Sequence, residues 1–293
     1  MSKFKKIIKK SELKSKLIPE RDLASIKVLK KAIKESSVLV TCMGLYNHGK
    51  STLLNTLIKD FEHKTFKTAD VRETAENKKV IYGDITFVDT PGLNAKENDN
   101  KRVFDAVKES DINLFVHNVS TGEFAKVEIE FLQNIKKHWN NPKEFIARTL
   151  FVLTRTDTVS EEDITTTQRR MQQQIQEIFG VTATLIAISA ITYTKGMIES
   201  KKLLVKKSNV EELENLLTSL KDNYKSSIVK TKRERLDRLY NELIKNFNSK
   251  IQKNKLIISQ KKRELKKLEK DFSHDIKNIE TTLLNIYIQL EEL

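Results

Sequence analysis

The sequence predicts an α/β fold, in which a mostly parallel sheet carries helices on both faces and long α-helices flank it at both ends. Two observations lead to this prediction. In the middle of the chain, short apolar runs alternate with amphipathic stretches, as strands and helices do around a parallel sheet. The 293 residues include only 7 Gly and 3 Pro, and 32% of them are charged. Such a composition favours long helices over β structure with many turns.

These patterns divide the chain into three predicted regions. Residues 1–35 form a basic helical segment, which Pro19 interrupts, so a second helix is expected to begin after it. Residues 36–225 hold all of the strand-like runs. Residues 226–293 contain neither Gly nor Pro, and they are expected to form a helical bundle or a coiled coil.

Six apolar runs are the predicted strands. Gly83-Asp84 joins the second and third of them, and such a pair is typical of a hairpin turn. Helices are expected between the later strands, for example at 127–139 and 168–179. The six runs are VLVTCMG (38–44), VIY (80–82), ITFVD (85–89), NLFVHNVS (113–120), LFVLTRTD (150–157) and TLIAISA (184–190).

The C-terminal region carries an apolar stripe whose members are nearly always three or four residues apart, as in a coiled coil or a helical hairpin. Polar residues fall on the same register at Asn254 and Lys261. A break is expected near DFSHD (271–275), with Ser273 as the N-cap of a new helix. The stripe is too long for a helix that packs only on its own domain, so we expect a partner helix from residues 1–35 or from another chain. Its members are Tyr240, Leu243, Phe247, Ile251, Ile258, Leu265, Leu268, Phe272, Ile276, Ile279, Leu283, Ile286 and Leu290.

The net charge of +14 lies at the two ends of the chain. It is +8 over residues 1–35, −2 over 36–200 and +8 over 201–293. Basic flanks indicate an acidic partner, either anionic lipid or nucleic acid. A lysine-rich helix face that is simply solvated would give the same pattern.

The single cysteine, Cys42, excludes an intrachain disulfide and indicates a reducing compartment. Its apolar surroundings in VLVTCMG are typical of a small buried side chain. No apolar run reaches the roughly 18 residues that a membrane-spanning helix needs, and the N-terminus MSKFKKIIKK has no signal-peptide core. We expect a cytoplasmic protein, or one that is peripheral on the inner face of the membrane.

The clearest motif is GLYNHGKS, in which Gly44 and Gly49 bracket four residues and Lys50 and Ser51 follow. It comes after a predicted strand and opens a predicted helix, as a phosphate-binding loop does. The glycines let backbone N–H groups turn toward phosphate oxygens, and the helix N-terminus adds partial positive charge. Lys50 is expected to reach the β- and γ-phosphates, and Ser51 to bind Mg²⁺. The predicted phosphate site consists of Gly44, Asn47, His48, Gly49, Lys50, Ser51 and Thr52.

A second motif, Asp89-Thr90-Pro91-Gly92, also ends a strand. Asp89 can hold Mg²⁺ through a water molecule, and the Gly92 N–H can contact the γ-phosphate. A threonine that closes over the metal is expected in the polar stretch TFKTADVRET (65–74), which has the character of a loop that orders around the γ-phosphate. We predict Thr74 for this role, with Thr68 as the alternative.

Two further strand ends predict which base is bound. Asp157 can accept hydrogen bonds from the N1–H and the exocyclic amine of guanine, whereas adenine offers an acceptor at N1. In the same TRTD motif, Thr154 ends the strand and Arg155 can lie along the base plane. The backbone at Ser189-Ala190 can meet the guanine O6. The four motifs, each at a strand end, predict GTP and GDP rather than ATP.

The hydrolytic machinery is less complete. Small GTPases place a glutamine directly after the glycine of the second motif to orient the attacking water, but here that residue is Leu93. Leucine cannot position water, so either turnover is slow or another group assists. The predicted catalytic residues are Lys50, Asn47 and Thr74.

Taken together, these motifs resemble the five G motifs of the translation-factor-like class of GTPases. GLYNHGKSTLLNTLI, DTPGLN and LFVHNVSTGEFAKVEIEFLQNI resemble bacterial dynamin-like GTPases over about residues 36–225. TRTD departs from the usual Asn-Lys-x-Asp but is similar to the Thr-(Lys/Arg)-x-Asp form of dynamin-type proteins.

The resemblance implies a P-loop GTPase domain whose flanking helices form a neck and trunk. It also implies a homodimer through the G domains or a second dynamin-like GTPase as partner, together with an anionic membrane surface. Asn47 matches the asparagine of the N-x-G-K-S form of Era-like GTPases, where the resemblance implies a bound K⁺. Dynamin-like chains are usually much longer than this one.

Two alternatives stay open. An Era-like GTPase acting on the ribosome or RNA would fit Asn47 and the basic flanks, although the sequence has no KH-type GXXG loop. A coiled-coil scaffold that GTP merely switches, with little turnover, would fit Leu93. The sequence assigns no role to His63, His117, His138 and His274, because their spacing does not suggest a metal site.

Overall fold

The computed structural model describes residues 18–34, 37–66, 77–93, 97–139 and 141–291. The chain divides into two compact units, one of Leu29–Arg233 and one of Met1–Val28 with Glu234–Leu293. Helix α2 (Glu20–Lys34) and helix α10 (Val210–Glu291) each contribute to both units. The predicted helix after Pro19 is therefore confirmed as α2.

The unit Leu29–Arg233 is built on a six-stranded sheet in the order β2-β3-β1-β4-β5-β6. Strand β2 pairs antiparallel with β3 through the predicted hairpin, and all other neighbours pair in parallel. Each predicted strand is confirmed within a few residues of its predicted bounds. The strands are β1 (Val38–Met43), β2 (Lys78–Tyr82), β3 (Ile85–Asp89), β4 (Ile112–Asn118), β5 (Thr149–Thr154) and β6 (Thr184–Ala187).

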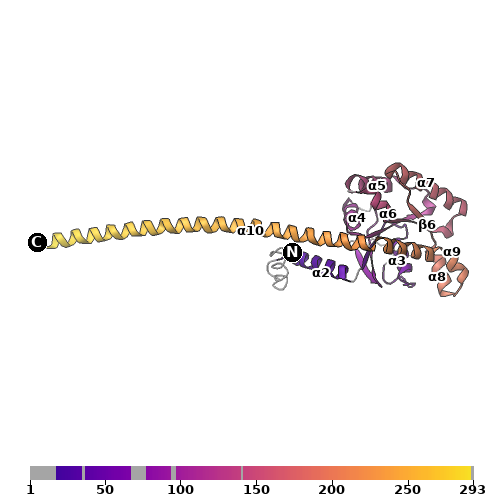
Figure 1. The fold of residues 1–293 in the computed structure, drawn as a ribbon, viewed down its shortest axis with the longest axis horizontal. Coiled ribbons are helices and arrows are strands. Elements are labelled where there is room, and N and C mark those ends of the chain that lie inside the picture. The colour runs from indigo at the N-terminus through magenta and orange to yellow at the C-terminus, as the bar shows by residue number, and fades with distance from the viewer. Residues whose placement is uncertain (1–17, 35–36, 67–76, 94–96, 140, 292–293) are drawn as a thin grey trace. The chain divides into compact units, whose positions relative to one another are not determined.

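Helices cover both faces of this sheet, which confirms the predicted α/β fold (Figure 1). Helices α3 (Lys50–Leu57), α8 (Ala190–Ile198) and the first turns of α10 pack on one face. Helix α9 (Lys202–Lys207) packs beside α8. The other face is covered by α4 (Glu97–Glu109), α5 (Lys126–His138), α6 (Pro142–Ala147) and α7 (Glu161–Phe179). Two short 3-10 turns, η1 (Val119–Thr121) and η2 (Thr156–Thr158), follow β4 and β5.

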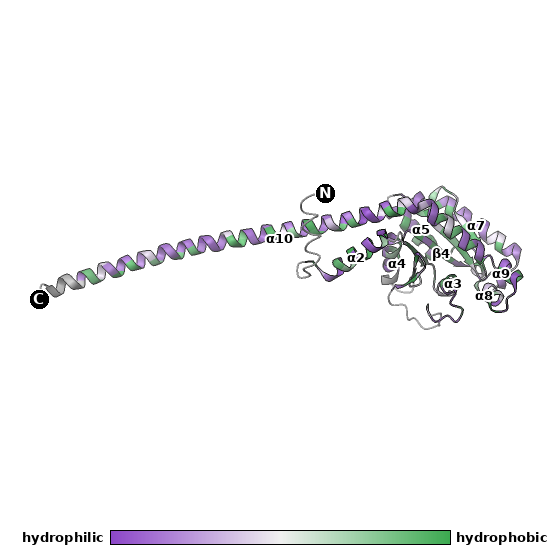
Figure 2. Cartoon of the chain, turned by 60° about the horizontal axis from the view of Figure 1, so that its bottom comes forward, coloured by the Kyte–Doolittle hydropathy of each residue, from purple (hydrophilic) through white to green (hydrophobic). Residues whose placement is uncertain are grey.

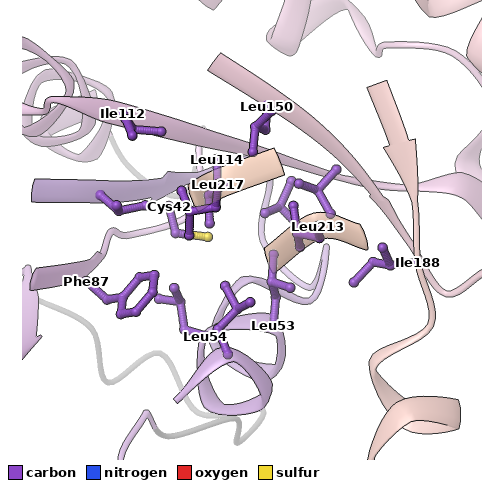
Figure 3. Close-up of a cluster of buried hydrophobic side chains, with 14 of the residues drawn as sticks. Cys42, Leu53, Leu54, Phe87, Ile112, Leu114, Leu150, Ile188, Leu213 and Leu217 are labelled. Atoms are coloured by element: carbon purple, nitrogen blue, oxygen red, sulfur yellow. The ribbon is translucent and has the colours of Figure 1, made fainter. Parts of the chain in front are cut away.

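The two hydrophobic layers follow from the alternation of side chains along each strand. Leu114 and Val116 of β4 point into one layer, and Phe115 between them points into the other. Because both faces are covered, these strands are apolar on both sides rather than alternating polar and apolar. Figure 3 shows the layer in which Cys42 packs near Leu114, and Cys42 is fully buried, as expected.

A buried ion pair fastens α10 to the sheet, more than 20 residues after the helix begins. Lys232 is 4% exposed, and its Nζ lies 2.7 Å from Asp111 Oδ2 and also donates to the Ser37 carbonyl. The same carboxylate oxygen accepts the Leu39 N–H at 2.8 Å. Asp111 therefore joins the start of β1, the start of β4 and α10 at one point.

The second unit contains the apolar stripe. Leu23 and Ile26 of α2 pack against Tyr240 and Leu243 of α10 in a small core, so residues from the predicted N-terminal segment do act as a partner helix. From Ile251 to residue 285 every side chain of α10 is exposed, although apolar positions recur along the helix (Figure 2). No helix in the described ranges is long and apolar enough to cross a membrane.

The expected break at DFSHD is wrong, because α10 is continuous from Val210 to Glu291. The Ser273 hydroxyl donates to the Glu269 carbonyl one turn earlier, at 2.8 Å. A serine can satisfy its hydroxyl in this way inside a helix, and no Gly or Pro interrupts this stretch. A residue type that often caps helices therefore marks no helix end here.

The buried pair makes a prediction for stability. Changing Lys232 to Met leaves Asp111 as an unpaired buried charge, so the free energy of unfolding is expected to fall by about 3 kcal/mol. Adding Asp111→Asn should recover part of the loss. Urea unfolding measures both, with exposed Lys230→Met as the matched control. A loss below about 1 kcal/mol for Lys232→Met would show that the pair does not hold α10 to the sheet.

Candidate functional site

The site lies where the parallel strands end. Strands β3, β1, β4, β5 and β6 run in the same direction, so their carboxyl ends meet at one edge of the sheet. In open α/β sheets this edge is where ligands bind. The sequence motifs follow β1, β3, β5 and β6, and the structure thus brings them to the same edge.

The loop after β1 has the backbone of a phosphate cradle. Gly44 has a φ of 145°, and a Cβ there would lie 2.1 Å from the Val116 carbonyl oxygen, so only glycine fits. Gly49 has a φ of 87° and stands at the N-cap of α3. Lys50, the first residue of α3, folds back and donates from Nζ to the carbonyls of Gly44 (3.2 Å) and Leu45 (2.9 Å). The loop is thus closed around a nearly buried ammonium.

Two oxygen donors stand beside this ammonium. The Ser51 hydroxyl donates to Asp89 Oδ2 at 2.7 Å, and Asp89 Oδ1 is buried with no hydrogen-bond partner in the described part of the chain. Burial raises the pKa of Asp89 and lowers that of Lys50, because each charge has left water with few partners. A hydroxyl and a carboxylate are the oxygen ligands that Mg²⁺ takes, usually with several waters. The donor set fits that ion, which would also supply a partner for Asp89 Oδ1.

The base motifs form a second group that is tied to the loop. Thr154 at the end of β5 donates from Oγ1 to the His48 carbonyl at 2.7 Å, and Arg155 donates from Nη2 to the Asn47 carbonyl at 3.0 Å. Asp157 Oδ1 accepts a hydrogen bond from the Ser189 hydroxyl at 2.6 Å. TRTD, the Ser189 position and the phosphate loop are therefore one connected structure.

The residues after Asp89 pack directly on the loop. A Cβ at Gly92 would lie 2.7 Å from the Tyr46 nitrogen, and the Leu93 N–H donates to the Gly44 carbonyl at 3.1 Å. The Leu93 side chain is 2% exposed and sits in the hydrophobic core. It is therefore directed away from solvent as well as chemically unable to hold a water.

The two threonines considered in the prediction for closing over the metal, Thr74 and its alternative Thr68, lie outside the described residues. Thr65 is described, and its N–H donates to Asp60 Oδ2 at 2.6 Å in the loop that follows α3.

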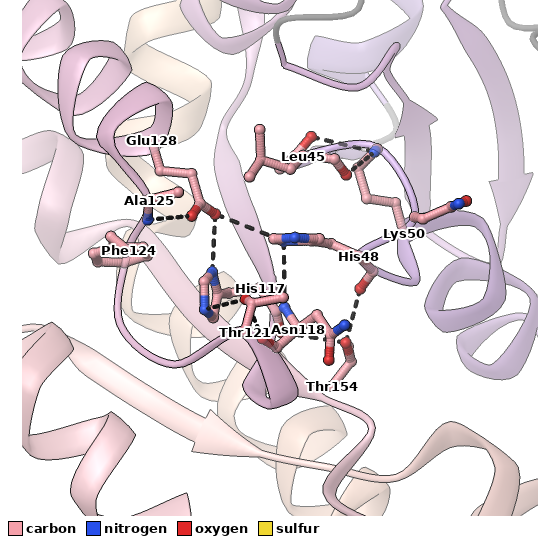
Figure 4. A network of polar contacts seen from close by, with 12 residues as sticks. Leu45, His48, Lys50, His117, Asn118, Thr121, Phe124, Ala125, Glu128 and Thr154 are labelled. Carbon is pink, nitrogen blue, oxygen red and sulfur yellow. Dashed lines mark hydrogen bonds and ion pairs between the residues drawn. The ribbon is translucent and has the colours of Figure 1, made fainter. Parts of the chain in front are cut away.

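The structure reveals a polar cluster that sequence reasoning missed. His48, His117 and Glu128 are all buried, and their ligand-type atoms lie within 4.8 Å of one another (Figure 4). Their positions, 48, 117 and 128, are far apart in the sequence, so no short motif connects them. The one available signal was AKVE at 125–128, where a glutamate three residues into a helix can cap its start. The Glu128 carboxylate does accept the Ala125 N–H at 3.0 Å.

The His48 side chain points into this cluster and away from the loop opening. Its Nδ1 accepts the Asn118 N–H at 3.3 Å, and the ring is edge-on to that of His117. Burial, together with the nearby His117 and Lys50, lowers the pKa of His48 to about 3. His48 is one of the predicted phosphate-binding residues, but its side chain is engaged in this cluster. It can therefore contribute only its backbone to phosphate binding.

This pKa predicts a difference in acid stability. The unfolded chain takes up a proton at His48 below pH 6.5 and the folded chain does not, so stability from this residue is lost as the pH falls from 6.5 toward 3. At pH 5 the loss should be about 2 kcal/mol relative to pH 7. His48→Asn should remove this dependence while exposed His138→Asn keeps it, as measured by urea unfolding at both pH values. Equal losses in wild type and His48→Asn would contradict the assignment.

Known proteins share parts of this sequence and of this fold. Residues 39–155 match a family model described as a 50S ribosome-binding GTPase. An uncharacterized protein of Acinetobacter baylyi is 33% identical over 182 residues, which make up 61% of this chain and 41% of that protein. The chain thus spans about two fifths of the length of this curated relative.

Two solved structures share the fold. LeoA, a bacterial dynamin GTPase from ETEC, is 13% identical with a TM-score of 0.55, over 77% of this chain and 43% of LeoA. A member of an oligomerised bacterial dynamin pair, described as sensing and tethering membranes, is 18% identical with a TM-score of 0.52, over 98% of this chain and 63% of that chain. At these identities the likeness concerns the fold. The family match over residues 39–155 and the loop geometry both indicate a P-loop GTPase domain in this part of the chain.

Proposed function

We propose that this chain binds GTP with Mg²⁺ and hydrolyses it to GDP and phosphate. The observation that carries the proposal is the group formed by Lys50, Ser51 and Asp89, with one Asp89 oxygen buried and unpartnered beside a closed glycine loop. Magnesium bound there would neutralise charge that develops on the phosphate oxygens. Ser51 and Asp89 would hold it, and Thr74 is our proposed third protein ligand.

The chain's own groups have distinct tasks in this proposal. Lys50 stabilises negative charge on the β- and γ-phosphates, and the Gly92 N–H donates to the γ-phosphate. A water oxygen forms the new bond to the γ-phosphorus as the bond to the β–γ bridging oxygen breaks. One proton of the water passes to another oxygen of the phosphate released, and the second proton stays on the attacking oxygen. Asp157 selects guanine by accepting from N1–H and the exocyclic amine, while Ser189 holds its carboxylate in place.

Leu93 cannot orient the attacking water, because its side chain is buried and apolar. Another group therefore has to do so. We propose that Asn47 contributes through a bound K⁺ and that two G domains meet face to face to complete each other's site. Asn47 has a φ of 60° and its carbonyl is held by Arg155, so its side chain is presented by a fixed backbone. The fold shared with bacterial dynamins supports this assembly over a monomeric switch.

The membrane surface and the ribosome are competing sites of action. We favour an anionic membrane, because the positive net charge lies in the two flanking regions of the sequence, 1–35 and 201–293. The family description that names the ribosome supports the alternative. The exposed stripe of α10 supports a third reading, a scaffold that GTP switches with little turnover.

Base selection is the first test. Asp157→Asn replaces a charged double acceptor, so GTP affinity is expected to fall about 100-fold, and xanthosine triphosphate should gain affinity because its 2-oxo group can accept from the asparagine amide. Fluorescent-nucleotide competition measures both changes. Exposed Asp105→Asn on α4 is the matched control. Unchanged GTP affinity in Asp157→Asn would remove the base assignment.

Turnover tests the assembly. Specific GTPase activity should rise with protein concentration, should be higher in K⁺ than in Na⁺, and should rise further with vesicles of phosphatidylglycerol and phosphatidylcholine than with phosphatidylcholine alone. Lys50→Ala should abolish turnover under all conditions. Activity that is equal in both salts and at all concentrations would exclude K⁺ and dimerisation. Indifference to the anionic vesicles would exclude the membrane.

A further inference from the structure

We propose that His48 is a positioning residue for the phosphate loop, and that the buried pair of His117 and Glu128 sets its place. The affinity of the loop for nucleotide would then depend on the start of α5, which lies outside the nucleotide motifs. This inference rests on the proposed nucleotide binding, which it deepens.

Residues 47 and 48 are held by contacts with the end of β5 and with β4. The Asn47 carbonyl is held by Arg155, which directly follows β5, and the His48 carbonyl is held by Thr154, the last residue of β5. The imidazole of His48 supplies a separate attachment to β4, because its Nδ1 accepts the Asn118 N–H at 3.3 Å. Since Asn118 is the last residue of β4, the ring joins the loop to the end of that strand.

The His48 ring is in turn held by contact with His117. The His117 ring meets the His48 ring edge-on, with centroids 5.1 Å apart and an interplanar angle of 89°. His117 is fixed at both nitrogens, to Glu128 Oε1 at 2.9 Å and to the Gly122 carbonyl at 2.7 Å. A carbonyl can only accept, so Nε2 is the donor to Gly122. His117 therefore has one orientation, and it limits that of His48.

This cluster is also connected to α5. Glu128 is fully buried at the first turn of the helix, where its second oxygen accepts the Ala125 N–H at 3.0 Å. Partial positive charge at a helix start stabilises a carboxylate there. One glutamate thus holds the start of α5 and His117 together, and Figure 4 shows the continuous line of contacts from Ala125 to His48.

The same three side chains have the composition of a metal site, but their contacts favour a hydrogen-bonded cluster without a metal. The Nδ1 lone pair of His48, which a metal would need, already accepts the Asn118 N–H. Lys50 and Arg155 add positive charge nearby, as their effect on His48 shows, and Glu128 is the one carboxylate in the cluster. A dication bound in the cluster would also be repelled by these two cationic side chains.

The decisive experiment compares two variants at one position. His48→Leu removes the acceptor for the Asn118 N–H, whereas His48→Asn keeps an acceptor at the same place on a smaller side chain. The dissociation rate of a fluorescent GDP analogue should rise about tenfold in His48→Leu and stay within about threefold of wild type in His48→Asn. His138→Leu, exposed at the end of α5, is the control and should leave the rate unchanged.

A double-mutant cycle tests the route through Glu128. Glu128→Leu should raise the same rate at least about threefold, and Glu128→Gln, which retains hydrogen bonds to both neighbours, should restore it. In the His48→Leu background, Glu128→Leu should change the rate by less than about twofold, because its effect passes through His48. Full additivity of the two changes would refute the route.

Hydrogen exchange separates this inference from the proposed function. In nucleotide-free protein, amides of residues 44–49 should exchange faster in His48→Leu than in wild type or His48→Asn. If wild type binds no guanine nucleotide, the proposed function fails, and this exchange pattern still tests the positioning role. If nucleotide binds but neither rate nor exchange changes in His48→Leu, the positioning role fails. Stoichiometric zinc in the purified protein would also overturn it, in favour of a metal site.

Discussion

The site depends on one buried ammonium. Lys50 is 8% exposed, and its ammonium donates to two loop carbonyls, while Asp89, which is hydrogen-bonded to Ser51, adds an electrostatic attraction. An isolated charge in a protein interior is costly unless polar groups surround it. The loop therefore has to keep its carbonyls turned toward Lys50, and much of the surrounding structure serves to hold the loop in that shape. A phosphate group would supply the missing negative charge.

The fold provides that support from several directions at once. Parallel strands bring β1, β3, β4 and β5 to the same edge, so contacts to the loop come from residues more than 100 positions away, as with Thr154 and His48. The helices on both faces cover the sheet up to these strand ends. A loop of six residues could not maintain this geometry alone, because its own hydrogen bonds are few. The proposed nucleotide binding thus depends on the whole sheet edge.

Much of this could be predicted from the sequence, because strands and loop motifs are local patterns. Gly44, Lys50 and Asp89 fall where the motifs placed them, since a strand end followed by glycine has few alternatives. His117 and Glu128 were not predicted, because their contact arises only when β4 and α5 pack together. The prediction of a helix break at Ser273 was wrong for a related reason. The sequence alone does not distinguish a serine that caps a helix start from one that lies within a helix.

The central claim is that this edge is built for a guanine nucleotide with magnesium. Calorimetric titration of the full chain with GDP and with ADP, each with Mg²⁺ and with a chelator, tests it most directly. The account predicts that GDP binds at least about 100-fold more tightly than ADP, since Asp157 rejects adenine by its hydrogen-bond pattern, and that the chelator weakens GDP binding. Equal affinity for the two nucleotides, or no binding of either, would contradict it.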